Sequence, residues 1–176
     1  MEFWLSFGSN LPRVELGKML YNMLCEVLFV ELIDYEAEVW DRTGNQYVSV
    51  GCTYFSMSSI NLDDEDEYIE RYRKLNLETH GVDTNVDISI QFISRTFDTG
   101  WLKFLELIGK LLQFNSQDLV VEDDASYPLL KRIDGYLLIN SRLNEHRTWY
   151  MTKENLALLN YSYKEEDFFK DSEQGS

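Results

Sequence analysis

The sequence predicts an α+β protein in which a single, mainly antiparallel sheet carries two helices packed on one face. Three observations lead to this prediction. Several short segments alternate apolar and polar residues, which is typical of strands with one buried face. Two longer stretches repeat apolar residues at helical spacing. The order strand, helix, strand, strand occurs at the start of the chain and again from residue 86 onward.

The first half of the chain has the pattern of one β-α-β-β unit. Residues 2–7 place three apolar side chains on one face of a strand. Residues 16–28 carry an apolar stripe at i, i+3, i+4 and i+7 spacing, which predicts a helix. Residues 33–39 and 47–55 alternate again and flank turn residues at 42–45. These two segments are therefore expected to pair as an antiparallel hairpin.

The second half begins with the same two elements. The strand expected over Val86–Ser94 alternates apolar residues with polar ones. The stretch Trp101–Phe114 has apolar residues at helical spacing through about four turns. Asp98 or Thr99 is the expected N-cap, because either side chain accepts a hydrogen bond from a free backbone N–H of the first turn.

Three strands are expected to complete this half. The apolar run 119–121 predicts a short strand, and residues 129–133 and 136–140 flank the pair Asp134-Gly135. An Asp-Gly pair adopts the positive φ angles of a tight turn, so the two flanking segments are expected to form a hairpin. The repeated β-α-β-β order points to an arrangement of the ferredoxin-like kind.

Two segments lie outside this repeat. Residues 56–85 are interpreted as an acidic insertion that links the halves, with a short helix over 68–75. The tail is expected to form a C-terminal helix capped by Thr152 and to fray over 170–176. The length of 176 residues predicts one domain, spanning 1–176.

The composition indicates the kind of partner. The chain has 31 acidic and 16 basic residues, which gives a formal net charge of −15. This charge opposes binding to nucleic acid or to anionic membranes and favours a basic protein partner. The start of the chain lacks a basic region, and no apolar run approaches the roughly 18 residues of a membrane span. We therefore expect a cytoplasmic protein in which Cys25 and Cys52 are reduced, buried thiols.

Catalytic motifs are absent from the sequence. His80 and His146 are 66 positions apart and are interpreted as surface histidines, and no pattern of zinc ligands occurs. There is no nucleophile elbow and no glycine-rich phosphate loop. The acidic run that begins at Asp63 lacks the glycine and the terminal glutamate of a calcium loop. We expect a protein without cofactor, metal or catalysis.

Aromatic residues make up 14% of the chain. Aromatic rings anchor protein interfaces, while carboxylates steer a basic partner and set its register. The alternative interpretation, favoured for any single ring, is that most of these rings cover the second face of the sheet. The aromatic candidates for an interface are Trp40, Tyr47, Trp149, Tyr150, Tyr161, Tyr163, Phe168 and Phe169.

The stretch Val86–Asn140 also carries a family resemblance. Its strand DISIQF, helix WLKFLELI, strand LVVE and hairpin strand GYLLIN resemble those of the immunity proteins of swarming-inhibition (Sit) toxin systems. More broadly, this layout is similar to the immunity partners of bacterial polymorphic toxins. The resemblance implies a cytoplasmic protein that binds a cognate toxin domain and blocks it without catalysis of its own.

Two acidic clusters are the candidate contacts with such a toxin. They are Asp63, Asp64, Glu65, Asp66 and Glu67, and then Glu122, Asp123 and Asp124. A solvated loop and a plain acidic turn are the alternative interpretations of these clusters. Two other functions remain open: an accessory or scaffold protein of a phage or mobile element, and a hydrolase that binds a metal through carboxylates.

Overall fold

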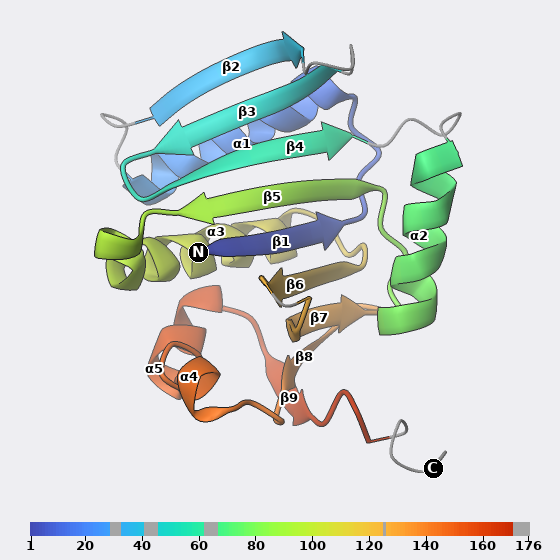
Figure 1. The fold of residues 1–176 in the computed structure, drawn as a ribbon, viewed down its shortest axis with the longest axis vertical. Coiled ribbons are helices and arrows are strands. Elements are labelled where there is room, and N and C mark those ends of the chain that lie inside the picture. The colour runs from blue at the N-terminus through green and yellow to red at the C-terminus, as the bar shows by residue number, and fades with distance from the viewer. Residues whose placement is uncertain (29–32, 41–45, 62–66, 125, 171–176) are drawn as a thin grey trace.

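A computed structural model describes residues 1–28, 33–40, 46–61, 67–124 and 126–170 (Figure 1). It has an α+β fold built on one nine-stranded sheet, with strand order β2-β3-β4-β5-β1-β6-β7-β8-β9. Neighbouring strands are antiparallel except for β8 and β9, which are parallel. The elements in chain order are β1 (Glu2–Phe7), α1 (Arg13–Leu28), β2 (Ile33–Trp40), β3 (Gln46–Cys52), β4 (Phe55–Asn61), α2 (Glu67–His80), β5 (Val86–Phe92), η1 (Ser94–Thr96), α3 (Phe97–Phe114), β6 (Leu119–Asp123), β7 (Pro128–Ile133), β8 (Tyr136–Asn140), α4 (Glu145–Thr148), α5 (Lys153–Leu156), η2 (Ala157–Leu159) and β9 (Tyr163–Glu166).

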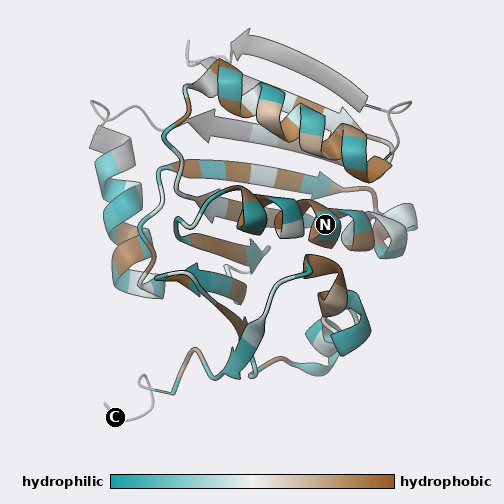
Figure 2. Cartoon of the chain, turned by 180° about the vertical axis from the view of Figure 1, so that it is seen from behind, coloured by the Kyte–Doolittle hydropathy of each residue, from teal (hydrophilic) through white to brown (hydrophobic). Residues whose placement is uncertain are grey.

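The main core lies between the sheet and the helices α1 and α3. These helices contact each other and cover the same face of the sheet, which is the near face in Figure 2. The alternation in β1 turns Phe3, Leu5 and Phe7 toward them, and all three side chains are buried. The longer helix, α3, buries ten residues, among them Trp101 and Phe104. Burial of these apolar surfaces is the dominant stabilising contribution to the fold.

Helix α2 lies against the other face, at one end of the sheet. It is mostly hydrophilic (Figure 2), and polar contacts hold its C-terminal half in place. Asn76 Nδ2 donates to Thr84 Oγ1 at 2.8 Å, and Lys131 Nζ on β7 donates to the His80 carbonyl oxygen at 3.0 Å. Lys131 thus lies at the C-terminus of α2, where the helix dipole favours a cation.

A buried arginine closes the C-terminal end of α3. Arg132 on β7 is 1% exposed. Its guanidinium donates to the carbonyl oxygens of Leu112 and Gln117, each at 2.7 Å, and to Asn115 Oδ1 at 3.0 Å. It satisfies acceptors left free where the helix ends and places positive charge at the negative end of the helix dipole.

Most expected elements are confirmed. β1, α1, β5, α3 and β6 include the predicted segments almost in full, and β2 pairs with β3 as the expected hairpin. Asp134 and Gly135 have φ angles of 51° and 82°, as the predicted turn requires, and β7 pairs with β8. The short helix expected over 68–75 is part of the longer α2. Cys25 and Cys52 are free thiols, but each is half-buried and not buried as expected.

The repeat of the ferredoxin-like kind is not confirmed. The strands that precede the two long helices, β1 and β5, lie side by side in the sheet but run antiparallel. Residues 56–85, expected as an insertion, supply nearly all of β4, which pairs with both β3 and β5. This segment therefore joins the two halves of the sheet as an interior strand.

Two local predictions are wrong. Helix α3 begins at Phe97, so Asp98 and Thr99 lie within its first turn, and Thr96 occupies the N-cap position. The tail forms two short helices and a ninth strand instead of one C-terminal helix. The expected cap at Thr152 is confirmed, because its side chain accepts from the Asn155 backbone N–H at 3.2 Å. Of the end expected to fray, residues 171–176 lie outside the described part of the chain.

Candidate functional site

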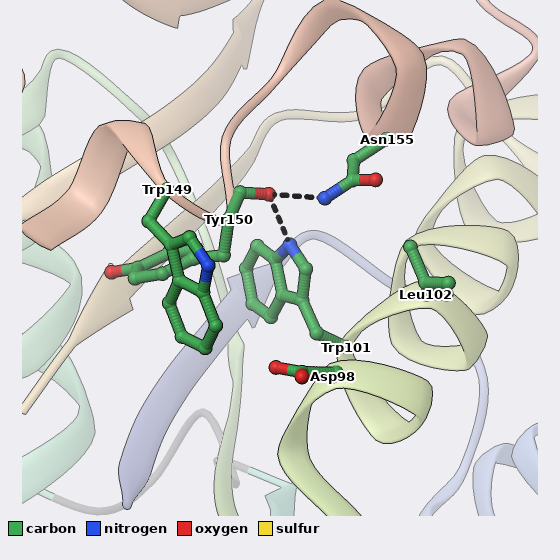
Figure 3. A pocket seen from close by; sticks show the side chains of 6 residues that line it. All are labelled: Asp98, Trp101, Leu102, Trp149, Tyr150 and Asn155. Carbon is green, nitrogen blue, oxygen red and sulfur yellow. Dashed lines mark hydrogen bonds between the residues drawn. The ribbon is translucent and has the colours of Figure 1, made fainter.

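A pocket of about 170 Å³ opens where the start of α3 meets the loop between α4 and α5 (Figure 3). Its walls come from two segments that are about fifty residues apart in the sequence. The two indole rings and the carboxylate of Asp98 border it, as Figure 3 shows. The lining residues are Asp98, Trp101, Leu102, Trp149, Tyr150 and Asn155.

The inner wall is fixed by a shared hydrogen-bond acceptor. The carbonyl oxygen of Tyr150 accepts from Trp101 Nε1 and from Asn155 Nδ2, each at 2.9 Å (Figure 3). Trp101 is 1% exposed and projects from α3, so this bond ties the loop to the most buried helix of the protein. Thr152 caps the next helix through the backbone of Asn155 and thereby holds that residue in place. The pocket is therefore rigid on this side.

The outer wall is an exposed tryptophan. Trp149 is 58% exposed, although its ring also packs on Phe97 with centroids 6.3 Å apart and planes inclined by 30°. Phe97 in turn stacks on Trp101 at 5.9 Å, so the outer ring is continuous with the aromatic core. The rest of the Trp149 indole faces solvent. A large aromatic ring held in this way is the kind of group that anchors a partner at an interface.

Asp98 gives the pocket its charge. Its side chain is exposed, and within the described part of the chain no cationic side chain pairs with it. Burial is the main cause that raises the pKa of the neighbouring Tyr150 hydroxyl; the charges of Asp123 and Asp124 act in the same direction, and the charge of Arg147 acts against them. A carboxylate beside an open indole face attracts cations.

The loop that carries Trp149 is held by a nearly buried ion pair. Arg147 Nε donates to Asp123 Oδ2 at 2.5 Å, with side chains that are 13% and 6% exposed. The same guanidinium lies over the Tyr127 ring, 3.8 Å from its centroid. The hydrogen bond to Asp123 raises the pKa of Arg147 above its usual value. These contacts anchor α4 on the β6–β7 hairpin and thereby position the pocket.

A second polar cluster lies buried beneath α2. Ser6 Oγ on β1 donates to Asp87 Oδ1 on β5 at 3.0 Å, and Tyr72 of α2 hydrogen-bonds both residues. Burial raises the pKa of Asp87 to about 6, and the charge of Glu122 acts in the same direction. Burial, and then the charge of Asp87, also raise the pKa of Tyr72. These three side chains hydrogen-bond one another and thereby attach α2 to the sheet.

The same cluster corrects the prediction for His80. This residue is 7% exposed, and its Nε2 lies 3.0 Å from Glu122 Oε1. It is a buried residue at the C-terminal end of α2, because the helix folds back over the polar face of the sheet. His146 is exposed, as expected, and its ring meets the ring of Tyr150 edge-on at 5.9 Å.

The predicted acidic contacts fall into three groups. Asp63, Asp64, Glu65 and Asp66 lie outside the described residues, and Glu67 is the first residue of α2, with a side chain that is not described. Glu122 and Asp123 are only 7% and 5% exposed, and they face His80 and Arg147. Because internal groups already engage them, these two carboxylates offer little to a partner. Asp124 is exposed in the β6–β7 turn.

Sequence reasoning missed most of the pocket. Trp149 and Tyr150 were recognised as interface candidates, but Asp98 was expected as a helix cap and Trp101 as core. A signal for the pocket was present in the pair Trp149-Tyr150 next to a capping threonine, which indicates a structured aromatic loop. Nothing local connects that loop with Asp98, since only the tertiary fold brings them together.

No protein-family model matches this chain, and neither the curated proteins nor the solved structures contain a match to it. Within the ranges that the structure describes, no helix has the length and apolar character needed to cross a membrane. The same ranges contain no group of three or more His, Cys, Asp and Glu side chains arranged to hold a metal ion.

Proposed function

We propose that this protein is a non-catalytic binding protein that captures a basic partner protein through its acidic, aromatic surface. More specifically, we propose an immunity protein that binds and neutralises a bacterial toxin domain in the cytoplasm. The observation that carries the proposal is the exposed Trp149 indole beside the Asp98 carboxylate, in a pocket whose inner wall is rigid. The resemblance to immunity proteins noted above supports the choice of a toxin as the partner.

Folding leaves more than half of the surface of Trp149 exposed. Its solvent-facing surface is 58% of the side chain and would be buried only by a partner. Tryptophan is enriched among the residues that dominate the binding energy of interfaces. Substitution of such an anchor by alanine commonly weakens binding by about 2 kcal/mol or more, which is roughly thirtyfold in the dissociation constant.

The net charge of −15 acts at longer range. It accelerates the approach of a basic partner and aligns it before contact, and salt screens this contribution. Among the described carboxylates, the exposed Asp98 and Asp124 are the ones that we assign to the interface. The cluster from Asp63 to Glu67 stays a predicted part of it. A surface rich in carboxylates can occupy a basic cleft of a toxin in place of nucleic-acid phosphate.

The buried groups beneath α2 have a structural role in this proposal. Asp87, Tyr72, His80 and Glu122 face one another between the helix and the sheet. Their perturbed pKa values follow from burial and mutual contact. They are therefore assigned to the attachment of α2 and not to a reaction.

The test is capture of a partner from source-cell lysate with the purified chain as bait, at low and moderate salt, followed by mass spectrometry. The expected result is one basic toxin domain, retained by the wild-type chain and lost by Trp149→Ala. Tyr136→Ala is the matched control, because Tyr136 is 66% exposed on the β7–β8 hairpin and does not line the pocket.

The outcome that contradicts the proposal is the absence of a specific partner at either salt concentration. Equal capture by wild type and Trp149→Ala would show that the pocket is not part of the interface. Capture of phage structural proteins, with no toxin domain among them, would favour the scaffold function instead.

A further inference from the structure

We propose that the pocket between α3 and the α4–α5 loop receives an arginine side chain of the partner, with its guanidinium stacked on Trp149 and paired with Asp98. The identity of the partner rests on the function proposed above. The chemistry of the pocket follows independently from its size, its aromatic wall, its charge and the hydrogen bonds that fix its inner wall.

The size of the pocket suits one side chain. Its volume is about 170 Å³, whereas sites for whole small-molecule ligands usually enclose roughly 300–1,000 Å³. The site is also open to solvent along Trp149, so a side chain that projects from a protein surface can enter it. We therefore infer an occupant of the length of a single long side chain.

The aromatic wall selects a cation. Tryptophan is the strongest cation–π acceptor among the side chains, and the interaction strengthens where water is excluded. The ring of Trp149 is fixed from behind by Phe97, with centroids 6.3 Å apart, so its open side is already positioned before a ligand arrives. The protein already shows this type of contact next to the pocket, where Arg147 lies 3.8 Å from the centroid of the Tyr127 ring.

The charge of the pocket selects a cation as well. Asp98 is exposed and, in the described part of the chain, has no cationic side chain paired with it. Two basic side chains of the helices around the pocket, Arg147 of α4 and Lys103 of α3, are engaged by Asp123 and Glu106 at 2.5 and 3.1 Å. A cation from outside the molecule therefore meets an unneutralised carboxylate.

Arginine fits better than lysine. Its guanidinium is planar, so it stacks on an indole while its edge donates to a carboxylate, and it is more weakly hydrated than an ammonium group. Trp149 and Asp98 supply these two complementary surfaces in one pocket. The ordering cost is low because Trp101 and Asn155 both fix the loop through the Tyr150 carbonyl oxygen.

The experiment is a titration of the full chain with N-acetyl-arginine methylamide, observed by NMR through the indole N–H signals of its four tryptophans. Trp149→Phe assigns the Trp149 signal. The expected result is a saturable shift of that signal with a dissociation constant on the order of millimolar. The lysine analogue is expected to bind several-fold more weakly, and the citrulline analogue, which has nearly the same shape without charge, is expected not to bind.

Asp98→Asn tests the carboxylate. This change keeps the size of an exposed side chain and is expected to weaken binding of the arginine probe by roughly threefold or more. Asp134→Asn is the control, because Asp134 is also exposed but lies in the β7–β8 turn, at a φ of 51° that asparagine accepts. Its binding constant is expected to equal that of wild type.

Three results would overturn the inference: no saturable shift of the Trp149 signal, equal shifts with arginine and citrulline analogues, or unchanged binding in Asp98→Asn. Failure here is distinguishable from failure of the proposed function. If the probe binds and no partner is captured, the pocket chemistry stands and the immunity function falls. If a toxin is captured but the probe does not bind, the immunity function stands and the arginine site falls.

Discussion

Asp87→Asn is expected to make the protein more stable at neutral pH while leaving its stability at pH 4 almost unchanged. Asp87 is 7% exposed on β5, beneath α2. Its carboxyl accepts from Ser6 and Tyr72, and the Glu122 charge opposes its ionisation. Asparagine has nearly the same shape and can accept the same Ser6 hydrogen bond without introducing a charge.

The magnitude follows from the pKa of Asp87. Burial raises that pKa from 3.8 to about 6, so the folded protein holds this proton more tightly than the unfolded chain does. The stabilisation associated with the protonated carboxyl is complete below pH 3.8 and is lost as the pH rises toward about 6. The loss amounts to at most roughly 3 kcal/mol of unfolding free energy. Because asparagine does not titrate, the variant is expected to exceed wild type by about 1–3 kcal/mol at pH 7.5.

The assay is urea unfolding of wild type and variant at pH 4 and pH 7.5, followed by tryptophan fluorescence and circular dichroism. All other titrating groups are common to both proteins. The difference in unfolding free energy between variant and wild type is measured at each pH, and its change from pH 4 to pH 7.5 therefore reports on Asp87. A difference that is the same at both pH values would refute the reasoning. Ser6→Ala is the companion variant: it removes a donor that lowers the pKa of Asp87, so its stability is expected to fall by a larger total amount, over a wider pH range, than that of wild type.

Three further substitutions test the packing by urea unfolding at a single pH. Arg132→Met leaves the carbonyl oxygens at the end of α3 without their donors, and about 3 kcal/mol of stability is expected to be lost; a loss below 1 kcal/mol would contradict its capping role. Gly109→Ala places a Cβ 2.5 Å from the carbonyl oxygen of Leu159, so a loss of about 1–3 kcal/mol is expected despite the higher helix propensity of alanine. Arg147→Met removes the cation from the ion pair with the buried Asp123 carboxylate, which is expected to cost about 3 kcal/mol and to change the fluorescence of Trp149; full stability would show that the ion pair is dispensable.

Local patterns were sufficient for most individual elements. The alternation in residues 2–7 and 86–92 and the apolar stripe of α3 require one buried face each, so their secondary structure and inward residues follow from the sequence. The pair Asp134-Gly135 specified its turn because few residues adopt positive φ at low cost. Local reasoning was less successful where short elements depend on neighbours that are distant in the chain.

The strands β4 and β9 illustrate this limit. β4 follows β3 after only two residues, and the serine-rich pattern of its sequence is weak, yet it pairs with β5 over seven residue positions. β9 is a four-residue strand that exists as a parallel partner of β8. Short strands of this kind gain stability chiefly from the strands beside them, so their own residues carry little signal.

By itself, then, the sequence determined the α+β class, the long helices, most strands, and an acidic, aromatic surface. Only the tertiary structure decided which of those acidic and aromatic side chains are exposed and can contact a partner. It buried Glu122 and Asp123 against His80 and Arg147, and it brought Asp98 to the side of Trp149. The physical reason is that side-chain periodicity encodes which face of an element is buried, whereas the pairing of distant elements depends on the packing free energy of the whole chain.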